Sequence, residues 1–265
     1  MTGTVTREAG RARLEIDLAA GGRLASLQVH GHELLVTSGP GPIHWGAYPM
    51  APYAGRVRNG RFTFRGRAYE LPVTLGGHAI HGTAYVQSWE EQSDGAFVTS
   101  LGPGWPFPGW ARQEIRLAHD GVSLRLEVHC EEGAMPASCG WHPWFVRRIG
   151  GAVAILDFHP GFMLERDGAG ISTRERRSPS AGPWDDCFGD VQGSPAISWP
   201  GLLRLELQSA CPYWVVFDRR EHAFCVEPQT APPDALNHDP FVVEPGRPLV
   251  AEFAIKWSLP PRADG

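Results

Sequence analysis

The chain has 265 residues, of which 42% are hydrophobic and 20% are charged, a balance typical of a folded globular protein. Its formal net charge of -5 gives no basic surface for nucleic acid, and no segment approaches the roughly 18 consecutive apolar residues of a membrane helix. The 32 glycines and 24 prolines follow no fixed period, which excludes a collagen-like chain and indicates many turns between short strands.

Four segments alternate apolar and polar residues with a period of two. In chain order they are residues 14–18, 62–65, 124–129 and 203–208. Such alternation predicts half-buried strands, each with one face on a core. Asp120 and Gly121 predict a tight hairpin between residues 113–119 and 122–129, because both residues tolerate positive φ. Arg65 and Gly66 predict another between residues 62–64 and 69–71.

The segment 251–257 near the C-terminus also alternates like a strand, with Phe253 on one face and Lys256 on the other. Lys256 is the only lysine among the 24 basic residues. A Schiff-base mechanism needs an amine in a desolvated pocket, so one solvated lysine disfavours that chemistry.

The pattern as a whole predicts an all-β protein. No segment of three turns has the periodicity of an amphipathic helix, no repeat of 20–50 residues stands out, and the even composition gives no linker. We therefore expect one large antiparallel β-sandwich domain over residues 1–265, with long loops that bring polar residues to one side.

The N-terminus and the cysteines indicate the compartment. Residues 1–10 show no apolar stretch after a basic segment, so we expect no secretory signal. The five cysteines are odd in number, widely spaced and without a CxxC pair. They are expected to be reduced, mostly buried thiols in a cytoplasmic protein.

Polar clusters interrupt the strand pattern. They are residues 52–61 with 76–82, residues 140–145, residues 225–235 and, more weakly, residues 184–188. Histidine and glutamate are well suited to proton transfer near neutral pH once burial has tuned their pKa values. His81 and His142 each have an ordinary alternative, as a turn residue and as a core histidine. Glu227 follows an apolar run and precedes a proline, and a carboxylate there needs a partner or a function.

Two other kinds of site leave weak signals. His78 and His81 have H-x-x-H spacing, but nothing forces both onto one face and no third ligand is near in sequence, so we predict no metal. Ser138 and Cys139 precede His142 without the glycine pattern of a nucleophile elbow.

Aromatic residues in or near the clusters are candidates for a sugar platform. They are Trp110, Trp141, Trp144, Trp184 and Phe188. An indole face can pack against the C–H face of a pyranose while nearby polar groups bind its hydroxyls. Most of the ten tryptophans are nevertheless expected to be core or strand residues.

The order of the clusters resembles the aldose 1-epimerase (galactose mutarotase) family over nearly the whole chain. The resemblance lies in residues 55–56, 80–82, 140–145 and 227–235, and the last two segments together are specific. One departure is Gly55, which stands where the family commonly has an asparagine and so removes a carboxamide from the site.

The resemblance implies a galactose mutarotase-like supersandwich and a set of roles in its cleft. By that resemblance His142 is the general acid, Glu227 the general base, and Arg56 and His81 bind sugar oxygens. Asp185 is the better match to a sugar-binding aspartate. The implied activity is interconversion of the α and β anomers of a free aldose by ring opening and closing. It needs a small sugar and no cofactor, and we expect a monomer or homodimer.

Two alternatives remain open from the sequence. One is a hexose-6-phosphate 1-epimerase of the same fold, because five arginines lie within residues 56–67 and three more within 174–177, where either group could bind phosphate. The other is a non-catalytic carbohydrate-binding protein that keeps the sandwich and loses the chemistry.

Overall fold

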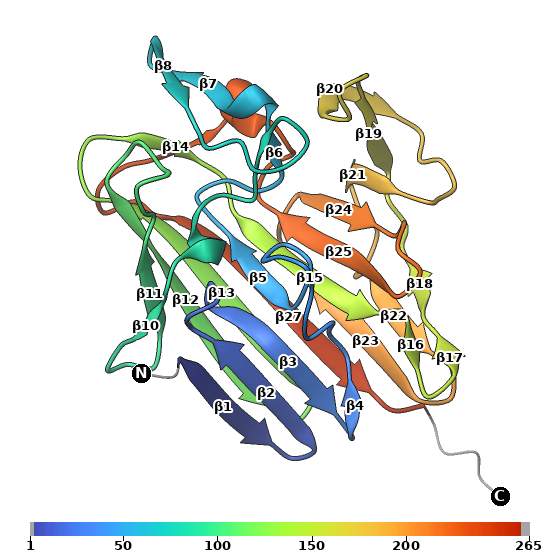
Figure 1. Ribbon diagram of the computed structural model, residues 1–265. Coiled ribbons are helices and arrows are strands. Elements are labelled where there is room, and N and C mark those ends of the chain that lie inside the picture. The colour runs from blue at the N-terminus through green and yellow to red at the C-terminus, as the bar shows by residue number, and fades with distance from the viewer. Residues whose placement is uncertain (1–2, 261–265) are drawn as a thin grey trace, which may run out of the picture.

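The structure, a computed structural model, describes residues 3–260 and confirms the all-β antiparallel fold (Figure 1). The first sheet runs in the order β1 (Thr4–Ala9), β2 (Ala12–Asp17), β3 (Arg23–Val29), β5 (Ala47–Met50), β15 (Gly140–Val146), β25 (Ala223–Gln229), β24 (Tyr213–Phe217), β21 (Asp185–Gly189), β19 (Phe162–Arg166) and β20 (Ser172–Arg177), with β4 (His32–Glu33) beside β3. The second runs β10 (Glu90–Glu91), β11 (Phe97–Ser100), β12 (Gly109–Ala118), β13 (Gly121–Cys130), β27 (Leu249–Ser258), β23 (Leu203–Gln208), β22 (Ala196–Trp199) and β18 (Ile155–Asp157).

Short elements complete the fold around these sheets. Four strand pairs are β6 (Arg56–Val57) with β9 (Ala79–Ile80), β7 (Arg61–Phe64) with β8 (Arg67–Glu70), β14 (Met135–Ala137) with β26 (Phe241–Val243), and β16 (Arg148–Ile149) with β17 (Ala152–Val153). Three 3₁₀ turns are η1 (Arg58–Gly60), η2 (Ala84–Val86) and η3 (Ala235–Asn237). No helix within residues 3–260 has the length and apolar character needed to cross a membrane.

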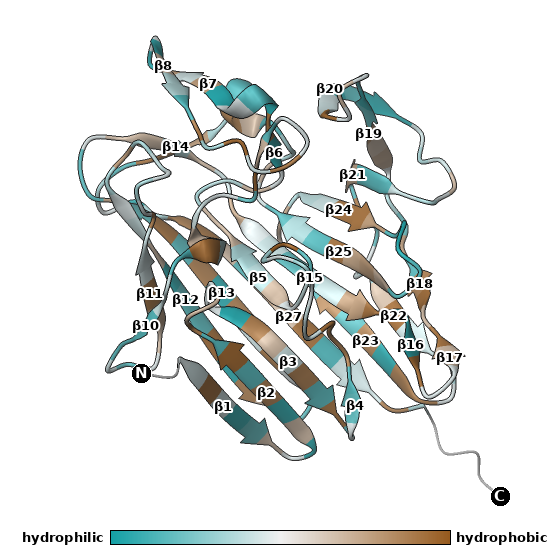
Figure 2. Ribbon diagram, viewed as in Figure 1, coloured by the Kyte–Doolittle hydropathy of each residue, from teal (hydrophilic) through white to brown (hydrophobic). Residues whose placement is uncertain are grey.

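The core lies between the two sheets. Strands such as β12 and β13 alternate buried and more exposed residues, and Figure 2 shows this as alternating bands of hydropathy along the strands. Trp141 of the first sheet packs on Phe253 of the second, with ring centroids 5.8 Å apart. Its indole N–H donates to Gln113 of β12 at 3.0 Å, so a buried polar pair also joins the layers.

Both predicted hairpins are present, one of them shifted. The β7–β8 hairpin turns at residues 65–66, both with positive φ, as predicted. In the β12–β13 hairpin Gly121 already pairs with Ala118, so the turn residues are His119 and Asp120, and none of the residues 119–121 has positive φ. The prediction was wrong by one position because Gly121 serves close packing: a Cβ there would lie 2.6 Å from a side-chain atom of β27.

Two central strands of the first sheet are buried on both faces. Every residue of β25, and every residue of β15 except the last, is buried. On β15 the core-facing residues alternate with His142 and Trp144, which therefore point away from the second sheet. The catalytic candidates His142 and Glu227 thus lie within strands, on one face of the sheet.

All five cysteines are free and buried, as expected. Burial is the largest influence on the thiol of Cys225, whose pKa it raises well above the ordinary value. A thiol that stays protonated is a poor nucleophile, so these cysteines behave as small apolar core residues.

Candidate functional site

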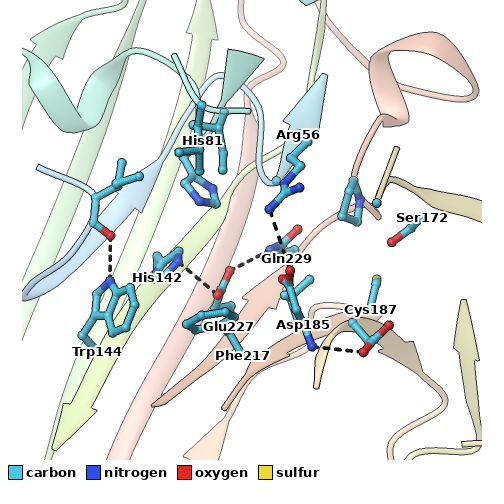
Figure 3. Close-up of a pocket in the computed structure, with 18 of the residues that line it drawn as sticks. Arg56, His81, His142, Trp144, Ser172, Asp185, Cys187, Phe217, Glu227 and Gln229 are labelled. Carbon is cyan, nitrogen blue, oxygen red and sulfur yellow. Dashed lines mark hydrogen bonds and ion pairs between the residues drawn. The ribbon is translucent and has the colours of Figure 1, made fainter. Parts of the chain in front are cut away.

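A pocket of about 240 Å³ opens on the face of the first sheet that points away from the second. It is lined by all five residues selected from the sequence, namely Arg56, His81, His142, Asp185 and Glu227 (Figure 3). They come from four separate regions of the chain, and the fold brings them together. The volume is at the small end of ligand pockets and suits a monosaccharide better than a longer chain.

His142 and Glu227 form the centre of the site. They lie opposite each other because β15 and β25 are antiparallel neighbours in a register that pairs Gly140 with Gln229 and Trp144 with Cys225. Residues opposite each other in such a pair point to the same face. His142 Nε2 lies 3.2 Å from Glu227 Oε1, and the two side chains are only 8% and 2% exposed.

Burial favours the neutral form of both partners. It is the largest cause that lowers the pKa of His142, to about 3, and the largest cause that raises the pKa of Glu227 well above its ordinary value. The Asp185 carboxylate raises the pKa of Glu227 further. Two groups this close titrate as a pair, so one proton is shared by His142 and Glu227 between the two extremes of pH.

Aromatic rings fix the plane of His142. The imidazole stacks on Tyr48 of β5, with centroids 4.8 Å apart, and on Trp144, with centroids 5.4 Å apart. His81 meets its edge at 4.8 Å. Burial lowers the pKa of His81 well below its ordinary value, so that ring is neutral and can donate or accept a hydrogen bond.

Asp185 lies between two guanidinium groups. Its Oδ2 is 3.8 Å from Arg56 Nη2 and 3.3 Å from Arg166 Nη2, and its backbone carbonyl accepts a hydrogen bond of 2.7 Å from Arg166 Nη1. Arg166 therefore holds the aspartate, while the guanidinium of Arg56 makes no hydrogen bond to another described residue and keeps its donors available to a ligand.

Gln229 belongs to the same site and was not selected from the sequence. It lies on the same face of β25 as Glu227, two residues on, and its Nε2 donates a hydrogen bond of 3.1 Å to Glu227 Oε2. Its own Oε1 is buried without a partner among the described residues. The signal was present in the Glu-Pro-Gln order, since residues two apart on a strand share a face.

Only one of the five aromatic candidates lines the pocket. Trp144 does, and Phe217 of β24, which was not selected, joins it. Trp141 and Phe188 are fully buried in the core, and Trp110 stacks on His129 of the second sheet at 3.7 Å. Trp184 lies outside the pocket lining. Sequence could not separate these cases because every one follows a strand-like pattern.

The two histidines of the H-x-x-H pattern separate in the structure. His78 Nδ1 accepts a hydrogen bond from the backbone N–H of Asn59, while His81 faces the pocket. Within residues 3–260 one group has ligand atoms close enough for a metal, namely His142, Cys225 and Glu227, all within 4.8 Å of one another. Two of these three groups, His142 and Glu227, already contact each other directly at 3.2 Å, a distance that allows a proton to pass between them.

Gly55 is closely packed. It has a φ of +67°, and a Cβ there would lie 2.9 Å from Pro233 Cγ. A side chain at this position would have to displace Pro233, which belongs to the segment 227–235. Its carbonyl accepts a hydrogen bond of 2.8 Å from the His81 N–H, so the glycine backbone still positions a pocket residue.

The arginine clusters lie mostly outside the pocket. Of the eight arginines in the two clusters only Arg56 lines it. Arg58 pairs with Asp167, and the exposed Arg61 pairs with Glu70 on the β7–β8 hairpin. The clusters therefore do not form a phosphate site facing His142 and Glu227.

Comparison with known proteins identifies the family of the chain. Residues 8–157 match the protein family described as Aldose 1-epimerase. The uncharacterized proteins YphB and YihR of Escherichia coli (strain K12) are each 24% identical to the chain. The first match covers 79% of this chain and 82% of YphB, and the second covers 92% of this chain and 90% of YihR.

Solved structures are similar over almost the whole chain. A galactose mutarotase-like protein from Clostridium acetobutylicum superposes with a TM-score of 0.83 at 15% identity, covering 97% of this chain and 95% of the other. Galactose 1-epimerase from Lactobacillus acidophilus NCFM superposes with a TM-score of 0.79 at 15% identity, covering 97% and 94%. At such identities the likeness establishes the fold alone.

Proposed function

Because the chain belongs to the aldose 1-epimerase family, we propose that it interconverts the α and β anomers of a free aldose. The observation that carries this proposal is the buried His142–Glu227 pair, with 3.2 Å between Nε2 and Oε1, in a pocket of monosaccharide size. Anomer exchange opens the ring, rotates the C1–C2 bond and closes the ring on the other face. It therefore needs one group that takes a proton and one that gives a proton.

Glu227 takes the proton of the C1 hydroxyl while His142 gives a proton to the ring oxygen. The C1–ring-oxygen bond breaks, C1 becomes an aldehyde carbonyl, and the ring oxygen becomes a hydroxyl. On closing, the same two groups act in reverse on the other face of the carbonyl. The pair begins and ends with one proton in total, so no cofactor and no external acid is consumed.

The shared proton explains how groups with opposite pKa shifts can work together. An empty pocket favours the neutral pair, with Glu227 protonated and His142 neutral. Transfer of that proton over 3.2 Å gives the carboxylate and imidazolium that ring opening uses. The Arg56 guanidinium, which lowers the pKa of Glu227, stabilises the carboxylate, and sugar oxygens that accept a hydrogen bond stabilise the imidazolium once the sugar is bound.

The remaining residues bind and orient the sugar. Arg56, His81 and Asp185 line the same pocket and offer donors and acceptors to its oxygens (Figure 3). Trp144 and Phe217 offer apolar faces to its C–H bonds. A neutral, hydroxyl-rich substrate fits a pocket where cationic and anionic side chains alternate.

The test is the rotation of freshly dissolved α-D-galactose and α-D-glucose, followed in a polarimeter with and without the protein. We expect the protein to speed the approach to the equilibrium rotation in proportion to its concentration. Acceleration only with the corresponding 6-phosphates would replace the proposal by the hexose-6-phosphate alternative. Saturable sugar binding without acceleration of any aldose would replace it by the binding-protein alternative.

A further inference from the structure

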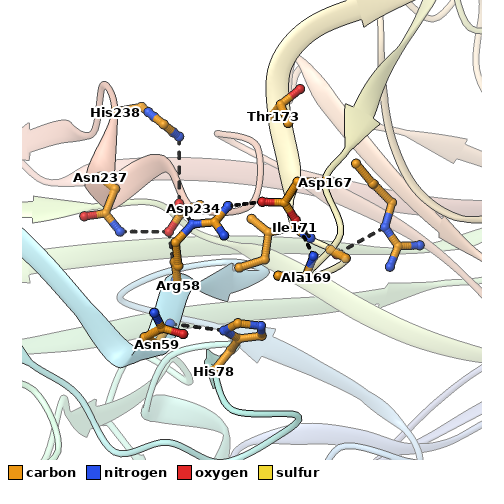
Figure 4. Close-up of polar contacts among 12 residues, drawn as sticks. Arg58, Asn59, His78, Asp167, Ala169, Ile171, Thr173, Asp234, Asn237 and His238 are labelled. Atoms are coloured by element: carbon orange, nitrogen blue, oxygen red, sulfur yellow. Dashed lines mark hydrogen bonds and ion pairs between the residues drawn. The ribbon is translucent and has the colours of Figure 1, made fainter.

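The loop between β19 and β20, residues 167–171, forms a wall of the sugar pocket. Gly170 in this loop and Ser172 just after it both line the pocket. Asp167 shapes the loop, because its Oδ1 accepts hydrogen bonds from the backbone N–H groups of Ala169 at 2.9 Å and Ile171 at 3.1 Å (Figure 4). The side chain of Ile171 is fully buried. The carboxylate of Asp167 thus holds the loop in one conformation.

The other carboxylate oxygen of Asp167 links the loop to Arg58, on another part of the chain. Arg58 in η1 donates from Nη2 to Asp167 Oδ2 at 2.5 Å (Figure 4). Arg58 is itself held by Asp234, which accepts its backbone N–H at 2.9 Å and lies 3.7 Å from its Nε. Asp234 is 3% exposed, so this anchor is rigid, and the charge of Arg58 is directed at the loop.

The loop also rests on the charged residues of the proposed sugar site. Arg166 Nε donates to the Gly170 carbonyl at 3.1 Å, while the same guanidinium holds Asp185. Gly170 has a φ of +74°, and a Cβ there would lie 2.8 Å from Arg166 Nη2. The chain approaches the guanidinium this closely because the residue is glycine. Any displacement of the loop therefore changes the side of the pocket where Arg56 and Asp185 lie.

Ser172 is the polar side chain that this wall presents to the pocket. It is 5% exposed and lines the pocket, so the exposed part of the residue faces a ligand there. A serine hydroxyl can both donate and accept a hydrogen bond, so it suits a hydroxyl of a sugar. Figure 3 shows the residue beyond Asp185, on the far side of the pocket from His142 and Trp144. A sugar that reaches both sides would meet His142 at one end and Ser172 at the other.

We propose that Ser172 binds a hydroxyl of the sugar, and that the Arg58–Asp167 ion pair is the positioning device that holds Ser172 against it. This inference rests on the proposed function of the same pocket and adds a determinant of sugar affinity to it. The ion pair is part-exposed, at 38% and 30%, so dissolved salt reaches and weakens it.

The test compares Ser172→Ala, Asp167→Asn and the double variant by initial rates of anomer exchange at varied galactose concentration. Asparagine keeps the oxygen that caps the loop and removes only the charge, so the variant folds. Each single variant is expected to raise KM roughly three- to tenfold with kcat within about twofold. The double variant is expected to match the singles, because Asp167 acts through Ser172.

Salt and a matched ion pair provide the controls. High salt is expected to raise KM of the wild type and to leave that of Asp167→Asn unchanged. Arg61→Gln breaks an exposed pair with Glu70, 2.9 Å long and away from the pocket, and is expected to leave KM unchanged. An unchanged KM in Ser172→Ala, or fold-changes that multiply in the double variant, would overturn the proposal.

A failure of the proposed function is distinguishable from a failure of this inference. If the wild type accelerates no aldose, the same variants are compared by the change in tryptophan fluorescence on galactose addition, since Trp144, one of the ten tryptophans, lines the pocket. Weaker binding in both single variants and no further loss in the double variant would still support the inference. Equal affinity in all four proteins would overturn it.

Discussion

Gln229 donates a hydrogen bond of 3.1 Å to the carboxyl group of Glu227, two residues earlier on the same face of β25. Both side chains are almost wholly buried, and the bond is the only one that another described side chain makes to this carboxyl besides the His142 contact. The amide lowers the pKa of Glu227 and so opposes the effect of burial. Gln229 therefore adjusts the strength of the proposed base.

Replacing Gln229 by leucine is expected to shift the pH profile of catalysis. The lost hydrogen bond raises the pKa of Glu227, so the His142–Glu227 pair keeps its last proton to a higher pH. The alkaline limb of kcat/KM then moves upward, and kcat falls by roughly tenfold because the carboxyl group loses its orientation.

A matched control lies on the molecular surface. Gln208 makes the same bond to Glu206, two residues away on β23, but both are exposed. Gln208→Leu is expected to leave the pH profile unchanged. An alkaline limb that stays in place in Gln229→Leu would show that the amide does not act on Glu227.

The wild-type pH profile is expected to show no acid limb near pH 6.5, the ordinary pKa of a free imidazole. The active pair holds one proton. A second proton binds only in acid, because burial lowers the pKa of His142 to about 3. Burial raises the pKa of Glu227, so the last proton leaves at a higher pH than it would from an ordinary carboxyl group. Rates of galactose mutarotation from pH 4 upward, corrected for the buffer reaction, test this, and a half-loss of kcat/KM on the acid side centred near 6.5 would contradict it.

Glu227→Gln is expected to increase stability while it abolishes catalysis. A carboxyl whose folded pKa is raised binds more protons folded than unfolded, so its contribution to stability falls as pH rises above 4.5 toward the folded pKa. A neutral amide avoids this loss, so the advantage of the variant grows with pH. For a chain of this length each kcal/mol corresponds to roughly 2–4 °C in Tm.

Thermal unfolding at several pH values measures this effect. The exposed Glu206→Gln on β23 is the control and is expected to leave Tm unchanged at every pH. A Tm difference between Glu227→Gln and wild type that shrinks as pH rises would refute the assignment of a raised pKa to Glu227.

Trp144→Phe is expected to weaken sugar binding. Trp144 lines the pocket, and its Nε1 donates to the Ile43 carbonyl at 2.8 Å, which fixes the ring and the loop beside it. Loss of ring area and of this bond is expected to raise KM roughly two- to tenfold with a smaller change in kcat. Trp110→Phe, on the second sheet, serves as the control. Equal KM values in the two variants would exclude Trp144 from the sugar site.

Sequence was sufficient for the fold because the evidence for strands is local. Alternation over segments such as 124–129 and 203–208 reflects one buried and one exposed face, and both segments are strands of the second sheet. Alternation could not show which residues of β25 face the pocket, because both faces of this strand are buried and its sequence does not alternate. There the motif order, and not periodicity, indicated Glu227.

Site residues could be predicted only where they lie in one of the sequence motifs. The five selected residues line one pocket, but Arg166, Ser172, Phe217 and Gln229 were missed. Arg166 lies on β19, which pairs with β21, and Ser172 lies on β20, which pairs with β19. No local pattern distinguishes these two residues from surface residues. Tertiary pairing decides which polar residue of a strand meets the pocket.

The most direct test of the central claim is the rate of galactose mutarotation by His142→Gln and Glu227→Gln beside the wild type, followed by polarimetry at one pH near neutrality. Both variants keep a neutral polar side chain in the buried pair, so folding is retained and proton transfer is removed. We predict that each variant loses roughly 10²–10⁴-fold in kcat. Turnover near the wild-type level in either variant would contradict the assignment of the His142–Glu227 pair as the acid and base.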